Sequence, residues 1–80
     1  MATLRLFAQA REAAGVSADV IEATTVDEVL NAACDRYGDG FRAVVATAKV
    51  WVNGEPALGS DVVGSNDEVA VLPPVSGGDK

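Results

Sequence analysis

The segment TTVDEVLNAACDRYGDG, residues 24–40, carries the strongest structural signal in this eighty-residue sequence. Thr25 precedes Glu28 by three positions, which is the spacing of a capping box, where two side chains satisfy free backbone N–H groups at a helix start. Apolar residues then recur every three or four positions: Val26, Val29, Leu30, Ala33, Cys34 and Tyr37. Gly38 and Gly40 are typical of a helix end. The segment therefore predicts one amphipathic helix whose apolar face covers the core.

Further segments read as β-strands because apolar residues alternate with others at a period of two. They are residues 3–8 (TLRLFA), 18–23 (ADVIEA, the weaker pattern), 49–54 (KVWVNG) and 68–72 (EVAVL). Asn53-Gly54 at the end of the third segment favours a tight turn. Pro73 follows the last segment and ends it, because proline cannot donate a hydrogen bond to a neighbouring strand.

The remaining segments are less regular. Residues 9–15 (QAREAAG) predict at most a short turn of helix that stops at Gly15. Residues 41–48 (FRAVVATA) predict a second short helix with these residues toward the core: Phe41, Val44 and Val45. Residues 55–58 (EPAL) favour a short edge strand weakened by proline, and residues 59–67 (GSDVVGSND) a loop with at most one helical turn.

The order of these elements predicts an α+β fold with one main helix packed on a small mixed sheet. This arrangement matches the β-grasp, or ubiquitin-like, fold. The length allows a single domain near the lower size limit for independent folding, and we assign residues 1–75 to the domain and residues 76–80 to a flexible C-terminal diglycine tail.

Composition narrows the function. The net charge of -6 argues against nucleic acid and anionic membranes as partners, and it suits a partner with a basic face. No apolar run is long enough to cross a bilayer and the N-terminal residues lack the pattern of a signal peptide, so we expect a cytoplasmic protein.

Catalytic residue types are scarce in the sequence. The chain has one cysteine and no histidine, which argues against a zinc site and removes the commonest general base. Cys34 lies on the apolar face of the predicted helix, where a cysteine is more often a small core residue than a nucleophile. The sequence therefore predicts no internal active site, no metal and no cofactor.

One face of the sheet carries large apolar residues. If the helix covers the face formed by Leu4, Leu6, Val50, Val52, Val69 and Val71, then Phe7, Trp51 and Leu72 lie on the opposite face. The first, third and last strands lie side by side in a β-grasp sheet, so the three residues form a patch that predicts a protein-binding site. A register shift by one residue would exchange the two faces.

The C-terminal segment PPVSGGDK, residues 73–80, combines stiff and permissive residues. Pro73 and Pro74 have a fixed φ and no N–H group, so the chain leaves the sheet in an extended form. Gly77 and Gly78 have no Cβ and fit a channel too narrow for other residues. A free glycine carboxylate can be adenylated and then attacked by sulfide to give a thiocarboxylate. Two glycines alone would be equally typical of an unstructured terminus with no function. The proline pair that precedes them in this segment favours a functional tail.

The segments LRLFAQAREAAG (residues 4–15) and NDEVAVLPPVSGG (residues 66–78) resemble the MoaD branch of the MoaD/ThiS sulfur-carrier family. The resemblance implies a β-grasp protein cosubstrate, not an enzyme by itself, whose terminal glycine is adenylated by a ubiquitin-activating-type enzyme and then thiolated. It further implies the small subunit of molybdopterin synthase, which donates sulfur inside a MoaE-like large subunit during molybdenum cofactor biosynthesis.

The resemblance also assigns roles by position. Gly78 becomes the residue that carries sulfur and Gly77 passes through the channel with it. The residues Pro73, Pro74 and Val75 form the stem, and Phe7 and Leu72 contact the large or the activating subunit.

The sequence departs from the family at Asp79-Lys80, which follow the diglycine. They are either removed by a metalloprotease, as in some carriers of secondary metabolism, or a vector-derived remnant. Two alternatives stay open: a sulfur carrier for thiamine, cysteine or a thio-natural product, and a β-grasp interaction module with an inert tail.

Overall fold

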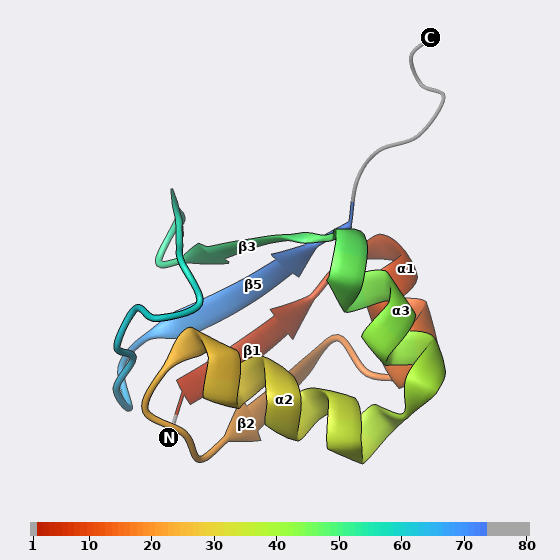
Figure 1. The fold of residues 1–80 in the computed structure, drawn as a ribbon, viewed down its shortest axis with the longest axis horizontal. Coiled ribbons are helices and arrows are strands. Elements are labelled where there is room, and N and C mark those ends of the chain that lie inside the picture. Colours follow the sequence, from red (N-terminus) through yellow and green to blue (C-terminus); the bar gives the residue numbers. More distant parts are fainter. Residues whose placement is uncertain (1, 74–80) are drawn as a thin grey trace, which may run out of the picture.

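A computed structural model gives the fold of residues 2–73, in which a mixed sheet packs against helices on one side (Figure 1). The elements follow one another in this order: β1 (Ala2–Leu6), α1 (Ala8–Ala14), β2 (Ala18–Ile21), α2 (Val26–Tyr37), α3 (Asp39–Thr47), β3 (Lys49–Val52), β4 (Glu55–Pro56) and β5 (Glu68–Leu72).

The sheet has five strands in the order β2-β1-β5-β3-β4. β1 and β5 are parallel, and every other neighbouring pair is antiparallel. The first, last and third strands therefore lie side by side, as the β-grasp prediction requires. The α+β fold class is confirmed.

The core lies between the sheet and α2, and strand alternation decides which side chains enter it. Leu4, Leu6, Val69 and Val71 are buried from the two central strands, while Val50 and Val52 are half-buried in β3. From the helices, Val26, Val29, Ala33, Cys34 and Phe41 are buried. The predicted core face is thus confirmed for the sheet. Leu30 differs, because it is only half-buried at the border of the core.

The N-terminus of α2 is capped as the sequence predicts, with one change in partner. Thr25 Oγ1 accepts a hydrogen bond from Glu28 N at 3.2 Å. Glu28 Oε1 in turn accepts from the backbone N–H and the hydroxyl of Thr24, at 2.9 and 2.7 Å, and not from Thr25 N–H. Both hydrogen bonds lower the pKa of the Glu28 carboxyl.

Several boundaries differ from the sequence predictions. α1 is a helix of seven residues and not a single turn, and Gly15 ends it with a φ of 82°. Gly38 ends α2, but Gly40 lies inside α3, so its assignment as a helix end was wrong. A glycine is readily accepted in the first turn of a helix, and sequence alone cannot separate that position from an end.

The loop between β4 and β5 contains no helical turn and instead covers the start of α2. Asp27 N donates to Gly59 O at 2.9 Å, and Val26 N donates to Asp61 O at 3.0 Å. Both donors lack partners inside the helix, because the first N–H groups of any helix are free. A Cβ at residue 59 would meet only the Asp27 carboxylate, which is exposed and can rotate away, so this contact does not by itself require glycine.

None of the helices among residues 2–73 is long and apolar enough to span a membrane.

Candidate functional site

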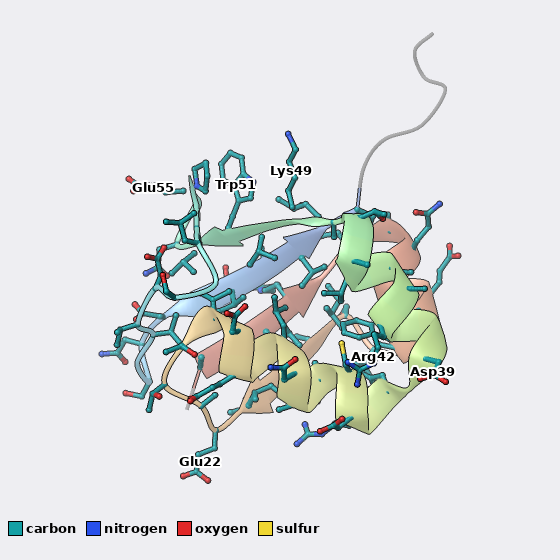
Figure 2. All side chains as sticks on the ribbon, viewed as in Figure 1. Glu22, Asp39, Arg42, Lys49, Trp51 and Glu55 are labelled. Atoms are coloured by element: carbon teal, nitrogen blue, oxygen red, sulfur yellow. The ribbon has the colours of Figure 1, made fainter. Side chains whose placement is uncertain are left out.

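The sheet face opposite α2 carries the three large apolar residues expected there. Phe7 is 44% exposed, and Trp51 and Leu72 are half-buried. Leu6, Val50 and Val71, their neighbours in sequence, face the core, so alternation directs these three side chains the other way. Figure 2 shows Trp51 and Lys49 projecting from β3 away from the helices.

Strand register sets the layout of this open-face patch, which we define as Phe7, Trp51, Ala70 and Leu72. Ala70 of β5 lies opposite Trp51 of β3 and opposite Arg5 of β1. Leu72 lies two residues beyond Ala70. Because Leu6 pairs with Val71, the next residue along each chain places Leu72 beside Phe7, which directly follows β1. Ala70 has the smallest side chain of the four residues in the patch.

Charged side chains border the patch. Arg5 Nε and Glu68 Oε2 form an ion pair at 2.8 Å on the β1–β5 side, and both side chains are about half exposed, 52% and 47%. Lys49 lies opposite Leu72. An apolar centre with a polar rim is typical of protein-binding surfaces.

The end of β5 brings the C-terminal segment to this patch. Pro73 is the last described residue, and it directly follows Leu72. The predicted stem and tail residues Pro74, Val75, Gly77 and Gly78 lie outside the described residues. Because Pro73 is bonded to Leu72, the C-terminal segment begins next to the patch.

The structure brings no catalytic constellation together within residues 2–73. Cys34 is only 4% exposed, and burial raises the pKa of its thiol, which fits a core residue. No group of three or more acidic or cysteine side chains in this part of the chain converges on a point where a metal ion would bind.

A groove of about 480 Å³ on the helix side of the molecule was not predicted. Its lining comes from α2, α3, β3, β4 and the loop after β4, and it includes Leu30, Val45, Val50, Trp51 and Pro56. Leu30 is half-buried because it faces this groove. No sequence pattern could have revealed the groove, because it depends on how these separate segments pack together.

A mixed five-stranded sheet with α2 across one face defines a ubiquitin-like protein of the β-grasp fold. SAMP1 from Haloferax volcanii matches it with a TM-score of 0.80 and 30% identity over 95% of this chain and 97% of that one. The putative molybdopterin converting factor subunit 1 from Pyrococcus furiosus has a TM-score of 0.77 and 25% identity over 92% and 97%. The BexX/CysO complex from Amycolatopsis orientalis, at 20% identity over 96% and 99%, shares the fold with a TM-score of 0.81. No curated protein matches the sequence.

The chain belongs to the ThiS family, whose model matches residues 4–78. It is thus a small ubiquitin-like sulfur carrier of the ThiS/MoaD type. The match ends at Gly78, the second glycine of the diglycine, so Asp79 and Lys80 follow the part of the chain that the family model describes.

Proposed function

We propose that Gly78 is the sulfur-bearing residue of this carrier and that the protein is the small subunit of molybdopterin synthase. The observation that carries the first part is the end of the family match at Gly78. The second part is supported by the likeness to the Pyrococcus furiosus protein, whose name is putative molybdopterin converting factor subunit 1.

The chemistry needs only an exposed glycine carboxylate. A ubiquitin-activating-type enzyme joins the Gly78 carboxylate oxygen to the α-phosphate of ATP and releases pyrophosphate. A sulfide donor then attacks the acyl carbon, the bond between that carbon and the phosphate-linked oxygen breaks, and AMP leaves. The product is a thiocarboxylate on Gly78. Glycine has no side chain to hinder this attack.

The open-face patch supplies the docking surface in this proposal. Phe7, Trp51 and Leu72 contact the adenylating enzyme and a MoaE-like large subunit in turn, while Pro73, Pro74 and Val75 lead Gly77 and Gly78 into the partner's channel. The patch is suited to this role because it includes Leu72, the last residue of β5, which directly precedes Pro73.

Gly78 is followed by Asp79, so its carboxylate is held in a peptide bond until the following residues are removed. We assign that step to a metalloprotease. The same observation favours a second candidate function, a sulfur carrier for thiamine, cysteine or a thio-natural product with the protease as a pathway component.

Intact-mass spectrometry tests the proposal. The eighty-residue chain and a chain that ends at Gly78 are each incubated with the adenylating enzyme, ATP and a sulfide donor. We expect only the shorter chain to gain the mass difference between sulfur and oxygen. The thiolated chain is then mixed with a MoaE-like subunit and the pterin precursor, where formation of the dithiolene identifies the molybdopterin pathway.

Gly78→Ala in the shorter chain is the matched control. A carrier loses sulfur transfer with this change, whereas an inert interaction module binds its partner as before. Equal adenylation of both chain lengths would contradict the masking by Asp79. Thiolation without dithiolene formation would support the second candidate function.

A further inference from the structure

The two edges of the sheet are protected in different ways. β4 has only two residues, Glu55 and Pro56, and proline offers no N–H group to another strand. β2 is longer, Ala18–Ile21, and within residues 2–73 no strand lies beside its outer edge. An unpaired edge strand is a template for pairing with another chain unless something blocks it.

Strand register shows which groups of β2 face outward. Leu6 N donates to Ser17 O at 2.9 Å, and the same antiparallel register pairs Leu4 with Asp19 and Ala2 with Ile21. Hydrogen-bonded pairs alternate with non-bonded pairs in such a ladder. The backbone groups of Ala18 and Val20 therefore face the free edge.

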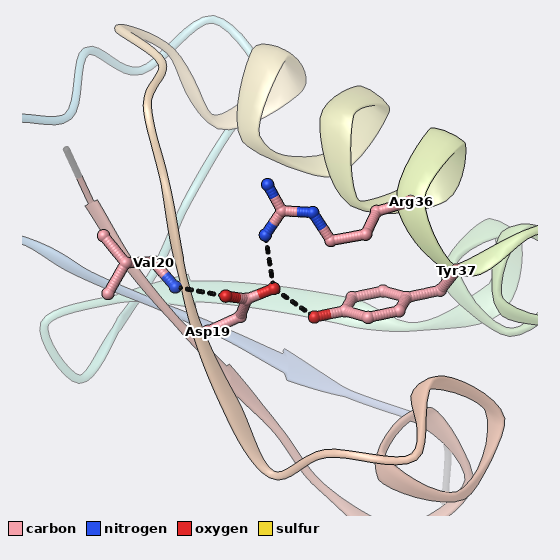
Figure 3. Close-up of polar contacts among 4 residues, drawn as sticks. All are labelled: Asp19, Val20, Arg36 and Tyr37. Atoms are coloured by element: carbon pink, nitrogen blue, oxygen red, sulfur yellow. Dashed lines mark hydrogen bonds and ion pairs between the residues drawn. The ribbon is translucent and has the colours of Figure 1, made fainter.

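The outward N–H group of Val20 is already occupied. Asp19 Oδ1 accepts its hydrogen bond at 2.8 Å, as Figure 3 shows. The other carboxylate oxygen, Oδ2, accepts from Arg36 Nη1 at 2.5 Å and from the Tyr37 hydroxyl. Two residues of α2 thus hold the carboxylate against the strand, so it does not swing away. The hydrogen bonds from Tyr37 and Arg36 also lower the pKa of the Asp19 carboxyl.

The edge is otherwise well suited to pairing. Val20 is 51% exposed, and Val16, just before the strand, is 40% exposed. A second copy of this chain presents the same outward groups, and antiparallel pairing about a two-fold axis is self-complementary. Any such pairing centred on β2 needs the Val20 N–H group. A pairing centred on Asp19 also sets two carboxylates opposite each other, which is unfavourable.

We propose that Asp19 is an edge guard, a residue that keeps β2 from pairing with β2 of a second copy by covering the Val20 N–H group. Removing the carboxylate exposes a donor and an apolar edge together, and the protein then forms a two-fold dimer with a continuous sheet. This inference does not depend on the sulfur-carrier proposal.

Sedimentation equilibrium of the Asp19→Ala variant tests the edge guard. We expect self-association to tighten by about tenfold or more relative to the unchanged protein, which corresponds to about 1.4 kcal/mol. Asp35→Ala is the matched control, because it removes the same charge from the exposed face of α2, where the carboxylate makes only a 3.4 Å ion pair with Arg42. This control is expected to leave self-association unchanged.

Asp19→Ala/Val20→Pro identifies the contact. Proline is tolerated on an edge strand but has no N–H group, so this double variant should be monomeric again. A folded Asp19→Ala variant that stays monomeric would overturn the proposal, and so would a double variant that still dimerises.

Hydrogen exchange of the unchanged protein gives a test that needs no variant. The protection of each amide is its exchange rate relative to the intrinsic rate of the same residue in an unfolded chain. The Val20 amide should be more protected than the outward Ala18 amide, because Val20 N–H has the Asp19 carboxylate as an acceptor. Equal protection would show that the guard is not held in place, and the proposal would be wrong.

Discussion

Among the four residues of the open-face patch, Phe7 stays exposed because of the backbone conformation of the residue that follows it. Ala8 has a φ of 51°, a left-handed value that side-chain-bearing residues rarely adopt. This value lets α1 begin directly after Phe7, whose own backbone is still extended with φ −127° and ψ 151°. Phe7 therefore stays on the sheet face with Leu72 and does not turn into the helix.

Leu72→Asp and Trp51→Ala are expected to weaken partner binding and leave the fold intact. Both side chains leave the sheet on the face without helices, and substitutions on such surfaces usually change stability by less than about 0.5 kcal/mol. Binding to the adenylating enzyme is measured by isothermal titration calorimetry, and folding by circular dichroism.

Leu58→Asp is the control for Leu72→Asp, because Leu58 is 70% exposed in the loop after β4. This variant should bind as the unchanged protein does. If Leu72→Asp unfolds the protein at neutral pH, then Leu72 belongs to the core and not to the patch.

Among the elements, α2 is stabilised by contacts with other segments at its start and near its end. The loop after β4 supplies carbonyl acceptors for Val26 and Asp27. Tyr37 near the other end packs edge-on against Phe41 of α3, with ring centroids 5.3 Å apart. Between these ends, Leu30 faces the groove and Val29 faces the core, although both belong to one apolar stripe in the sequence.

The same substitution, leucine to alanine, is expected to cost different amounts of stability at a core position, Leu4, and at a groove position, Leu30. Leu4 is fully buried, and we expect a loss of about 2–5 kcal/mol from the cavity that remains. Leu30→Ala is expected to cost less than about 2 kcal/mol, because a groove open to water leaves no closed cavity. Urea unfolding measures both losses. Equal losses would mean that Leu30 is as well packed as Leu4.

At the scale of the whole molecule, acidic residues outnumber basic ones by twelve to six, and several carboxylates stabilise the fold only when charged. Asp19 joins β2 to α2, Glu28 caps α2, and Asp67 accepts from Asn53 Nδ2 at 2.8 Å beside the β3–β4 turn. Hydrogen bonds lower the pKa of all three carboxyls. The three contacts lie at different places in the fold, so acid weakens it at several points at once.

We expect stability to fall as the pH drops below about 4, the ordinary range for these groups. A carboxyl whose pKa is lower in the folded state stabilises the fold above its unfolded pKa, and that contribution disappears as the pH falls through the folded pKa. Urea unfolding between neutral and acid pH measures this loss of stability. The protein concentration is kept low enough for every variant to stay monomeric. Asp19→Asn should reduce the pH dependence. An unchanged dependence would show that Asp19 does not contribute to it.

Local sequence patterns were enough to predict the periodic elements, and they indicated a carrier tail. Alternation in β1, β3 and β5 assigned the two sheet faces, and the Thr25–Glu28 spacing marked the start of α2, because these signals act between residues close in the chain. The diglycine motif, with its resemblance to known carriers, pointed to the family. None of these conclusions required knowledge of which distant segments meet.

Features that depend on contacts between distant segments could be assigned from the three-dimensional structure alone. Whether Leu30 faces the core or a groove depends on where α3 and β3 pack. The backbone of Gly59 caps α2 only because its carbonyl reaches Asp27 N–H, far away in the sequence. In the sequence, Asp19 is indistinguishable from any other polar strand residue. The structure shows that Arg36 and Tyr37 of α2 donate hydrogen bonds to its carboxylate. Local patterns cannot encode these contacts, because each depends on the relative positions of elements that the whole core sets together.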